Sequence, residues 1–394
     1  MQIVVHRGTH QIGGVATEIR TESTRIIIDM GNELSWDDGF IPEDLSIPGV
    51  TDLNGHCDAV LFTHSHGDHV GQIQNIRDGI PLYMGAFAKD ILLKTLPKNE
   101  VSLKLRIEQV KLLKPGEQLR IGDITITPYS VDHSACDSYM FLIEADGKRI
   151  LHTGDFRLHG FRGKAIPKLL SKVIGKVDIL IMEGTTLSRD DVQPITEREL
   201  QQIVKGYMTQ YKYVFVLCAS TNLERICALA KAVPRGKYFI CDEYQAQLLE
   251  LMEKHWGNYS ELYRNIKRMI YGENLFHRFQ DKGFLMMVRD NQNFRKIMQR
   301  FNAKESILLY SMWDGYRTRP ASTIPDFLNI IGRWEPLHTS GHAPQKDLRL
   351  VIEKINPDII IPIHTDSPER LQAICPGHKV MVLKDGEEKN LDRL

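Results

Sequence analysis

The chain has 394 residues, of which 42% are hydrophobic and 25% are charged, and this is the composition of an ordinary soluble globular protein. At roughly 150 residues per domain, the length indicates about two domains. The formal net charge is zero. This excludes a bulk basic field that would attract nucleic acid, so any site for a polyanion has to be a local patch.

The N-terminus, MQIVVHRGTH, has no charged leader followed by an apolar core, and no stretch reaches the ~20 uncharged residues that a membrane span requires. We therefore expect a cytoplasmic protein with no membrane partner. The six cysteines lie far apart and form no C-x-x-C pair. This disfavours a zinc knuckle or a redox pair and predicts reduced, mostly buried thiols.

Short strand-like runs recur through the first half of the chain. Residues 17–29 and 139–153 read as hairpins, because extended runs flank the polar turns TEST and ADGK. Residues 85–96 and 165–174 have apolar residues three and four apart, which indicates helices. Mixed strands and helices predict a layered α/β or α+β domain.

The segment THSHGDH follows one of these strand-like runs and places four metal-ligating side chains within six positions, namely His64, His66, Asp68 and His69. Such groups repel one another when charged and cost desolvation when buried, so a purely structural role is disfavoured and metal binding is favoured. His64 and His66 would face the same way in an extended segment, whereas Asp68 and His69 lie past the bend at Gly67.

Three further candidate ligands, His133, Asp155 and His364, each follow an apolar run, where a strand should end and a loop begin. Taken alone, His364 is more often a hydrogen-bonded structural residue, and Asp155 could merely stabilise a turn. Imidazole and carboxylate groups bind zinc, and seven of them indicate two ions. The other histidines considered are assigned to structural or surface roles: His6, His10, His56, His152 and His159.

From about residue 196 helix and strand alternate as in a parallel-sheet unit, and the histidines return only in the tail. We therefore predict an interrupted first domain, residues 1–195 and 336–394, and an inserted domain, residues 196–335. Within the insert, the strand-to-helix turn CASTN, residues 218–222, suits either phosphate binding or a simple helix cap.

Basic residues concentrate in the insert: Arg264, Lys267, Arg268, Arg278, Lys282, Arg289, Arg295, Lys296, Arg300, Arg317 and Arg319. If they face a cleft, they supply a local field for a polyanion. If they are dispersed, they form a solvated helix face, which is the default interpretation. Tyr316 beside Arg317 could offer a surface for base stacking.

These motifs resemble those of a known family. THSHGDH with His133 and Asp155 downstream resembles the metallo-β-lactamase fold, an αββα sandwich with a dinuclear site at one edge, and Asp29 is similar to the early aspartate that orients its site residues from behind. Glu183 in ILIMEGTT, His342 in HTSGHA and His364 in IPIHTD resemble the three motifs of the β-CASP branch, whose members cut nucleic acids and carry an inserted α/β domain. SVDHSACDS, TSGHAPQKDL and INPDIIIPIHTD are most similar to the ribonuclease J group.

The resemblance implies a metal-dependent ribonuclease that holds two divalent ions, with zinc expected and manganese as the alternative. His64, His66 and His133 would hold one ion, Asp68, His69 and His364 the other, and Asp155 would bridge them. A hydroxide formed at the ions would attack the RNA phosphodiester and leave a 5′ phosphate and a 3′ hydroxyl.

The resemblance also implies three catalytic residues. His342 would protonate the leaving 3′ oxygen as general acid, and Asp68 would act as a ligand and not as a base. Glu183 is expected to hydrogen-bond a ligand histidine and fix its tautomer, although it could only cap the following turn. In the ribonuclease J group the corresponding serine and histidine help hold a terminal 5′ phosphate, so Ser340, Gly341 and His342 are the expected substrate-binding residues.

The expected partner is single-stranded RNA with a 5′ monophosphate, and whether cutting is end-directed or internal stays open. DNA is an alternative substrate, and assembly as a homodimer is also left open. A carboxyl-ester or thioester hydrolase with the same dinuclear site is a competing hypothesis, as is a noncatalytic β-CASP partner. Many ribonuclease J sequences follow the last histidine with Gly-Glu, whereas this chain has Thr365 and Asp366, so contacts to substrate there should differ.

Overall fold

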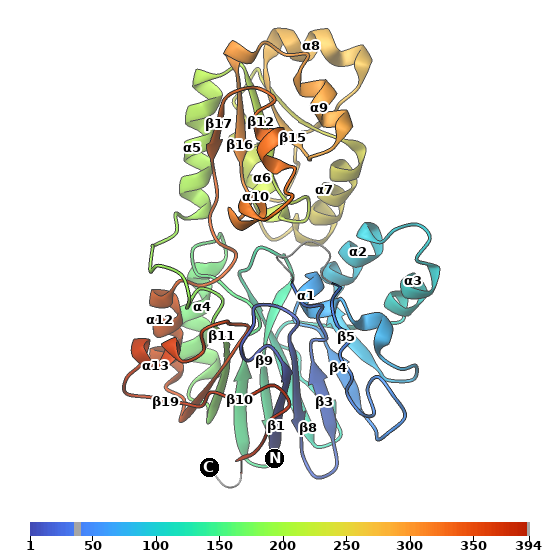
Figure 1. The fold of residues 1–394 in the computed structure, drawn as a ribbon, viewed down its shortest axis with the longest axis vertical. Coiled ribbons are helices and arrows are strands. Elements are labelled where there is room, and N and C mark those ends of the chain that lie inside the picture. The colour runs from blue at the N-terminus through green and yellow to red at the C-terminus, as the bar shows by residue number, and fades with distance from the viewer. Residues whose placement is uncertain (35–40, 392–394) are drawn as a thin grey trace. The chain divides into compact units, whose positions relative to one another are not determined.

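The structure is a computed structural model, and it describes residues 1–34 and 41–391 of the chain. The described residues divide into two compact units. Unit 1 contains residues 1–34, 41–193 and 341–391, and unit 2 contains residues 194–340 (Figure 1). The chain therefore enters unit 2 from unit 1 and returns to it, and the predicted insert, residues 196–335, lies within unit 2.

Unit 1 is built around two seven-stranded sheets. The first has the order β20-β1-β2-β3-β4-β5-β6, with strands β1 (Gln2–Arg7), β2 (Ala16–Arg20), β3 (Arg25–Ile28), β4 (Ala59–Leu61), β5 (Leu82–Gly85), β6 (Lys111–Leu113) and β20 (Glu388–Asn390). The second has the order β19-β18-β11-β10-β9-β8-β7, with strands β7 (Leu119–Ile121), β8 (Ile124–Val131), β9 (Ser138–Ala145), β10 (Lys148–His152), β11 (Ile179–Glu183), β18 (Ile359–Ile363) and β19 (Lys379–Val380).

Helices cover the outer faces of the two sheets. They are α1 (Gly67–Val70), α2 (Ala86–Thr95), α3 (Val101–Glu108), α4 (Ile166–Leu169), α12 (Gln345–Ile355) and α13 (Arg370–Ile374). Helices α2 and α3 lie on the side of the first sheet, and α4, α12 and α13 lie on the side of the second. The unit is an αββα sandwich, so this part of the fold prediction is confirmed. None of the helices described is long and apolar enough to span a bilayer.

The side chains of β9 show why the two sheets stack. Because side chains alternate between the faces of a strand, Tyr139, Phe141 and Ile143 join the core between the sheets, whereas Met140 and Leu142 join the core beneath the outer helices. A strand buried on both faces is a continuous apolar run. The runs that end at the candidate ligands are of this kind, so the sandwich provides rigid strand ends for a site.

The local predictions for unit 1 are confirmed. The segments around TEST and ADGK form the antiparallel pairs β2–β3 and β9–β10. The helix predicted at residues 85–96 is α2, and the one at 165–174 begins as α4 and continues as a π-helical turn, Leu170–Ile174. The six cysteines, of which three lie in each unit, are all buried and unbridged.

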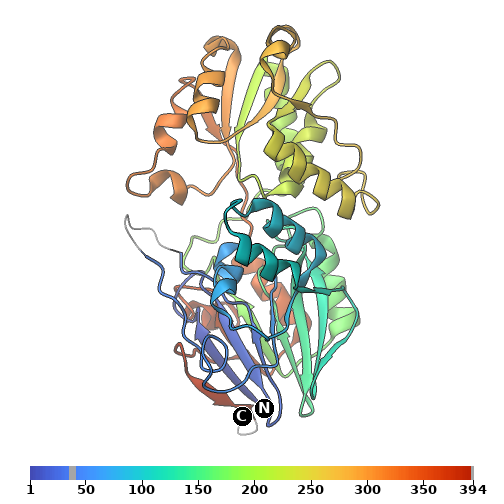
Figure 2. The same cartoon turned by 90° about the vertical axis from the view of Figure 1, so that its right-hand side faces the viewer.

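Unit 2 contains one six-stranded parallel sheet flanked by helices, and the predicted parallel-sheet unit is confirmed (Figure 2). The sheet has the order β14-β13-β15-β12-β16-β17. The strands are β12 (Tyr213–Leu217), β13 (Tyr238–Cys241), β14 (Met269–Ile270), β15 (Phe284–Val288), β16 (Ser306–Tyr310) and β17 (Trp334–Pro336). The helices are α5 (Glu197–Gln210), α6 (Leu223–Ala232), α7 (Glu243–Trp256), α8 (Phe276–Lys282), α9 (Gln292–Met298), α10 (Gly315–Thr318) and α11 (Ile324–Leu328).

A buried ion pair ties together the two ends of unit 2. Arg225 on α6 donates to the carboxylate of Glu197 in the first turn of α5, at 2.6 Å, and both side chains are buried. The same guanidinium donates at 2.8 Å to the carbonyl of Thr339, near the exit of the unit. Thr339 in turn donates through its hydroxyl to the carbonyl of Ile195, near the entry. The entry and exit segments of unit 2 are thus held side by side.

Candidate metal centre

The segment THSHGDH leaves β4 and turns sharply into the short helix α1. The helix places Asp68 and His69 on a turn that Gly67 begins. This turn packs against Gly31 so closely that a Cβ on Gly31 would lie 1.6 Å from the carbonyl oxygen of Asp68. Only glycine allows such an approach of two backbone segments.

Two of the site residues have left-handed backbone conformations. Asp29 follows β3 with φ 61°, and His364 follows β18 with φ 54°. Residues other than glycine rarely adopt this conformation, and when they do it is often at a functional site. Each of the two residues follows the end of a buried strand. The amide of His364 is fixed by a hydrogen bond of 2.7 Å to the carbonyl of Gly8.

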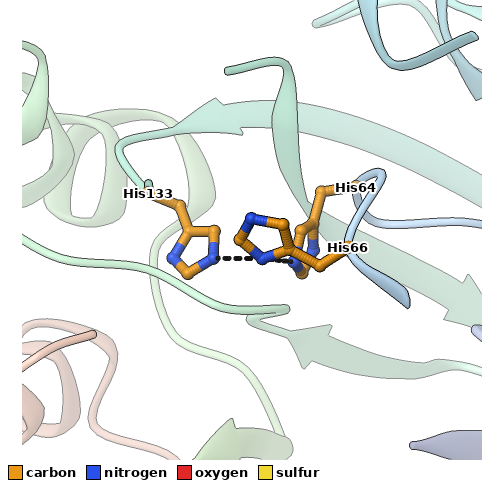
Figure 3. A group of neighbouring side chains, drawn as sticks. All are labelled: His64, His66 and His133. Atoms are coloured by element: carbon orange, nitrogen blue, oxygen red, sulfur yellow. Dashed lines mark hydrogen bonds between the residues drawn. The ribbon is translucent and has the colours of Figure 1, made fainter. Parts of the chain in front are cut away.

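Three imidazoles converge from two separate segments, as Figure 3 shows. The Nδ1 atom of His66 lies 3.1 Å from Nε2 of His64 and 3.2 Å from Nε2 of His133. His64 and His133 are buried, whereas His66 is partly exposed. One nitrogen of each ring therefore faces the same small volume.

Asp155 lies at the middle of a larger group of donors. Its Oδ2 atom is 3.2 Å from Nε2 of His69, 3.9 Å from Nε2 of His64 and 3.8 Å from Nε2 of His133. The Nε2 atom of His364 is also 3.9 Å from it. On the partly exposed side, the same nitrogen of His364 lies 3.2 Å from Oδ2 of Asp68.

The structure thus brings all seven predicted ligands together. The ligand atoms within each of three sets lie within 4.8 Å of one another: His64, His66 and His133; His64, His69 and Asp155; and Asp68, His69 and His364. Their assignment to two ions stays a prediction.

Groups behind the imidazoles fix the tautomers of four of them. The carbonyl of Gly341 can only accept, so His133 donates to it from Nδ1 at 2.7 Å. The hydroxyl of Thr63 donates to Asp29 at 2.8 Å and is therefore left to accept from Nδ1 of His64 at 3.0 Å. In each ring the lone pair then lies on Nε2, the atom that faces the site.

The other two imidazoles follow the same pattern. Nδ1 of His69 donates to Oδ2 of Asp29 at 2.8 Å. The hydroxyl of Thr185 lies 3.3 Å from the carbonyl of His364, to which it donates, and 2.7 Å from Nδ1 of the same residue, from which it accepts. His69 and His364 thus also present Nε2 to the site.

The electrostatics prepare these groups to bind a cation. Burial and the neighbouring imidazoles hold the pKa of His64 well below its ordinary value, and burial does the same for the pKa of His133. Burial disfavours a charge on Asp155, but the surrounding imidazoles, His364 and His69 first, hold its pKa well below the ordinary value. Neutral imidazoles around an ionised carboxylate are the form in which these side chains bind a metal. His69 differs, because the carboxylates of Asp155 and Asp29 outweigh its burial and raise its pKa well above the ordinary value.

Two orphaned atoms show that the donor set fits a metal ion. Among the described residues, Nε2 of His69 and Oδ2 of Asp155 are buried without a hydrogen-bond partner, although they lie 3.2 Å apart. Buried polar atoms are rarely left unsatisfied. A divalent cation with a preference for nitrogen and oxygen ligands would satisfy both.

The structure differs from the sequence expectation for Glu183. We expected this residue to hydrogen-bond a metal-ligating histidine, but its Oε2 atom lies 3.1 Å from Nδ1 of His342, the expected general acid. Its Oε1 atom accepts from the backbone amide of Phe156 at 2.9 Å. The expectation was wrong in the partner because sequence order does not reveal which of several neighbouring imidazoles a carboxylate will face.

The expected substrate-binding residues fall on both sides of the unit boundary. His342 belongs to unit 1, and its side chain is 21% exposed. Gly341 also belongs to unit 1 and gives its carbonyl to His133, whereas Ser340 is the last residue of unit 2. In CASTN, Asn222 precedes α6 without capping it through its side chain. The cap interpretation therefore loses its support.

The basic residues predicted in the insert are mostly paired. Six arginines form ion pairs with carboxylates: Arg264 with Glu261, Arg268 with Glu253, Arg289 with Asp242, Arg295 with Asp290, Arg300 with Glu273, and Arg317 with Asp314. This agrees with the default interpretation of a solvated surface. These arginines do not add up to a free basic field.

Sequence reasoning missed the residues that hold the imidazoles from behind, apart from Asp29. Thr63 immediately precedes the first histidine of THSHGDH, and Thr185 follows two residues after Glu183. A hydroxyl near a predicted site residue was the only signal. It is weak, because threonine is common at strand ends.

We expect Thr185→Val to lower metal affinity by about 10 to 100-fold, because the imidazole of His364 loses the acceptor that fixes its tautomer. Competition against a chromogenic chelator measures this. Thr186→Val is the matched control, since the hydroxyl of Thr186 is also buried but donates to the carbonyl of Ala343. Equal affinities of the two variants would contradict the proposed role of Thr185.

Two family descriptions match the chain. Residues 24–217 match a "Beta-lactamase superfamily domain", and residues 328–373 match a "Zn-dependent metallo-hydrolase RNA specificity domain". A solved structure of a protein of unknown function from Enterococcus faecalis V583 superposes with a TM-score of 0.77 at 21% identity, covering 98% of this chain and 99% of that one. This last likeness shows the fold alone.

The chain is also similar to several proteins named ribonuclease J. It is 21% identical to that of Sinorhizobium meliloti over 82% of this chain and 61% of the relative. It is 22% identical to that of Helicobacter pylori strain 26695 over 97% of this chain and 59% of the relative. The chain thus spans about three fifths of the length of these relatives.

Proposed function

The chain belongs to the metallo-β-lactamase superfamily, β-CASP branch, and from that premise we propose that it is a metal-dependent ribonuclease of the ribonuclease J type. The observation that carries the proposal is the convergence of four imidazoles, those of His64, His69, His133 and His364, on Oδ2 of Asp155, with His66 and Asp68 beside them. The match to an RNA specificity domain at residues 328–373 supports RNA as the substrate.

We assign the two ions as the motifs imply. His64, His66 and His133 would hold one, Asp68, His69 and His364 the other, and Asp155 would contribute to both. When bound, such ions supply a water of lowered pKa and positive charge for the phosphate oxygens. Zinc is the proposed metal, with manganese as the alternative, because imidazole suits zinc and carboxylate suits both.

His342 is the proposed general acid. Its Nδ1 atom faces Glu183 at 3.1 Å and Asp155 at 3.7 Å. Burial lowers the pKa of His342, but the carboxylates of Glu183 and Asp155 outweigh it and raise that pKa above the ordinary value. When this imidazole is protonated, its Nδ1–H group donates to Glu183, and its Nε2 proton is available to the leaving 3′ oxygen. That oxygen takes up the proton as its bond to phosphorus breaks.

The proposed substrate is single-stranded RNA with a 5′ monophosphate, for which Ser340, Gly341 and His342 would bind the terminal phosphate. Glycine and serine allow backbone amides to approach an anion. Hydrolysis would leave a 5′ phosphate and a 3′ hydroxyl.

The test uses protein loaded with zinc or manganese and labelled single strands of RNA and matched DNA that carry a 5′ monophosphate, triphosphate or hydroxyl. We expect the monophosphorylated RNA to be cut fastest. Analysis of the product ends then checks the chemistry. Turnover of carboxyl esters or thioesters without any cleavage of nucleic acid would refute the proposal.

The role of His342 predicts a dependence on the leaving group. We expect His342→Ala to slow RNA hydrolysis by about a hundredfold or more. The same change should have far less effect on bis-p-nitrophenyl phosphate, because p-nitrophenolate leaves without being protonated. A merely structural role would slow both reactions equally, so parallel losses would contradict the assignment.

A further inference from the structure

Unit 2 contains a cavity of about 770 Å³. It does not lie beside CASTN, the strand-to-helix turn at residues 218–222. Its lining comes from residues 230–239, which include the end of α6, the loop that follows it and the start of β13, and from the segment that leads into β14, residues 265–269. Because β13 and β14 are parallel neighbours, both segments lie at the N-terminal ends of their strands. CASTN follows the C-terminal end of β12, so the cavity is at the other edge of the sheet.

The lining of this cavity is strongly basic. It contains five cationic side chains, Lys231, Arg235, Lys237, Lys267 and Arg268, and none of its lining residues is acidic. A cavity of this size is typical of ligand sites. The formal net charge of the whole protein is zero, so the cavity is a local concentration of positive charge.

Four of the five cations have no carboxylate partner among the described residues. Arg268 is the exception, because it pairs with Glu253 at 2.7 Å. The ammonium of Lys231 donates to the carbonyl of Arg264, and that of Lys237 donates to two carbonyls at the end of α5, each at 2.7 Å. Neutral carbonyls orient these charges without neutralising them.

The cations of the cavity differ from the arginines in the rest of unit 2. Elsewhere in the unit, arginines such as Arg289 and Arg317 are paired with carboxylates. Lys237 is half-buried, and burial together with the neighbouring Lys212 lowers its pKa. A cation that is desolvated beside another cation is stabilised by an anion.

We propose that this basic cavity binds the phosphate groups of a single-stranded RNA chain at a place separate from the metal centre. Lys231, Arg235 and Lys267 are exposed, and exposed cations bind a polyanion through release of its counterions. A small phosphorylated ligand would need buried donors that converge on it, whereas these three cations are in solvent. The choice of RNA as the polyanion rests on the proposed function.

Such a site would hold a part of the substrate that is not being cut. Its contribution to RNA affinity should therefore depend on the length of the RNA. Only a strand longer than the ~4–16 nucleotides of a typical single-strand site can occupy the metal centre and the basic cavity at once. Binding to a short oligonucleotide at the metal centre should be unaffected.

The test measures binding without cleavage. The full chain carrying Asp155→Asn is titrated into labelled single-stranded RNA of about 30 nucleotides and of about 6 nucleotides, and anisotropy is recorded over a range of potassium chloride concentrations. The test variant adds Lys231→Gln, Arg235→Gln and Lys267→Gln. The matched control adds Lys205→Gln, Lys296→Gln and Lys304→Gln, which are exposed lysines of unit 2 that do not line the cavity.

Each phosphate contact contributes about 0.7 to the salt slope of single-strand binding, so we expect the test variant to lower the slope for the long RNA by about 2. Its affinity at low salt should fall at least tenfold relative to the control, with the short RNA unchanged. Equal slopes and affinities in the two variants would overturn the proposal. So would loss of inorganic phosphate binding, measured by calorimetry, with RNA affinity intact, because the cavity would then be a small-anion site.

Failure of this proposal and failure of the proposed function are distinguishable. If the wild-type chain cuts no RNA, the function fails, but the anisotropy comparison is still valid because it requires no cutting. If RNA is cut and the test variant binds long RNA like the control, only the cavity proposal fails. Melting temperatures of both variants exclude unfolding as the cause of a weaker affinity.

Discussion

Replacing Asp155 with asparagine is expected to lower kcat/KM for RNA hydrolysis by about ten-thousandfold, which corresponds to ~5.4 kcal/mol of transition-state stabilisation. Asparagine has the same shape but no charge. Oδ2 of Asp155 is the atom on which Nε2 of His64, His69, His133 and His364 converge within 3.9 Å. Without the negative charge of this carboxylate, nothing would offset the electrostatic repulsion between two cations bound there.

The measurement combines RNA hydrolysis with metal content by mass spectrometry. We expect the variant to retain fewer than the two ions proposed for the wild type. Asp326→Asn is the control, because Asp326 is an exposed carboxylate in the first turn of α11. Circular dichroism shows whether the fold is kept. Wild-type activity of the Asp155 variant would remove the metal centre from the mechanism.

Replacing Arg225 with methionine should lower the free energy of unfolding by about 3–5 kcal/mol, because the carboxylate of Glu197 then stays buried without its guanidinium partner. Arg225 and Glu197 are both fully buried, and the guanidinium also donates to Thr339. Urea unfolding followed by tryptophan fluorescence measures the loss. Arg317→Met is the control, since that arginine pairs with Asp314 at the surface.

A double-mutant cycle tests the cause of this loss. Adding Glu197→Leu to Arg225→Met removes the unpaired charge, so part of the stability should return, because an apolar replacement of a buried pair is often near neutral. If Glu197→Leu lowers the free energy of unfolding of the Arg225→Met variant by as much as it lowers that of the wild type, then the unpaired charge is not the cause of the lost stability. The ion pair would then be only one contact among several.

Much of the fold and of the metal centre could be predicted from the sequence, for a clear physical reason. Apolar runs buried on both faces are easily recognised as strands, and side chains at their ends are placed by the sheet itself. His133, Asp155 and His364 each follow such a run, and THSHGDH is too dense in titratable groups to be buried without compensation. Short-range patterns therefore located the seven predicted ligands, which the structure brings together.

The hydrogen bonds around those ligands could not be predicted in the same way. The carbonyl that holds His133 belongs to Gly341, 208 positions away, and any backbone carbonyl would serve. The partner of Glu183 depends on which imidazole the chain brings nearest after folding. The basic cavity could not be predicted either, because the positions of arginines and lysines in the sequence do not show which of them have carboxylate partners.

The bond between Thr339 and Ile195 has a consequence for how this protein could have arisen and how it can be dissected. A module whose first and last residues meet can be added to a loop of a host, or removed from it, without stretching either partner. Residues 194–340 should therefore tolerate expression as a separate polypeptide. The host should likewise tolerate a short glycine-serine bridge in their place.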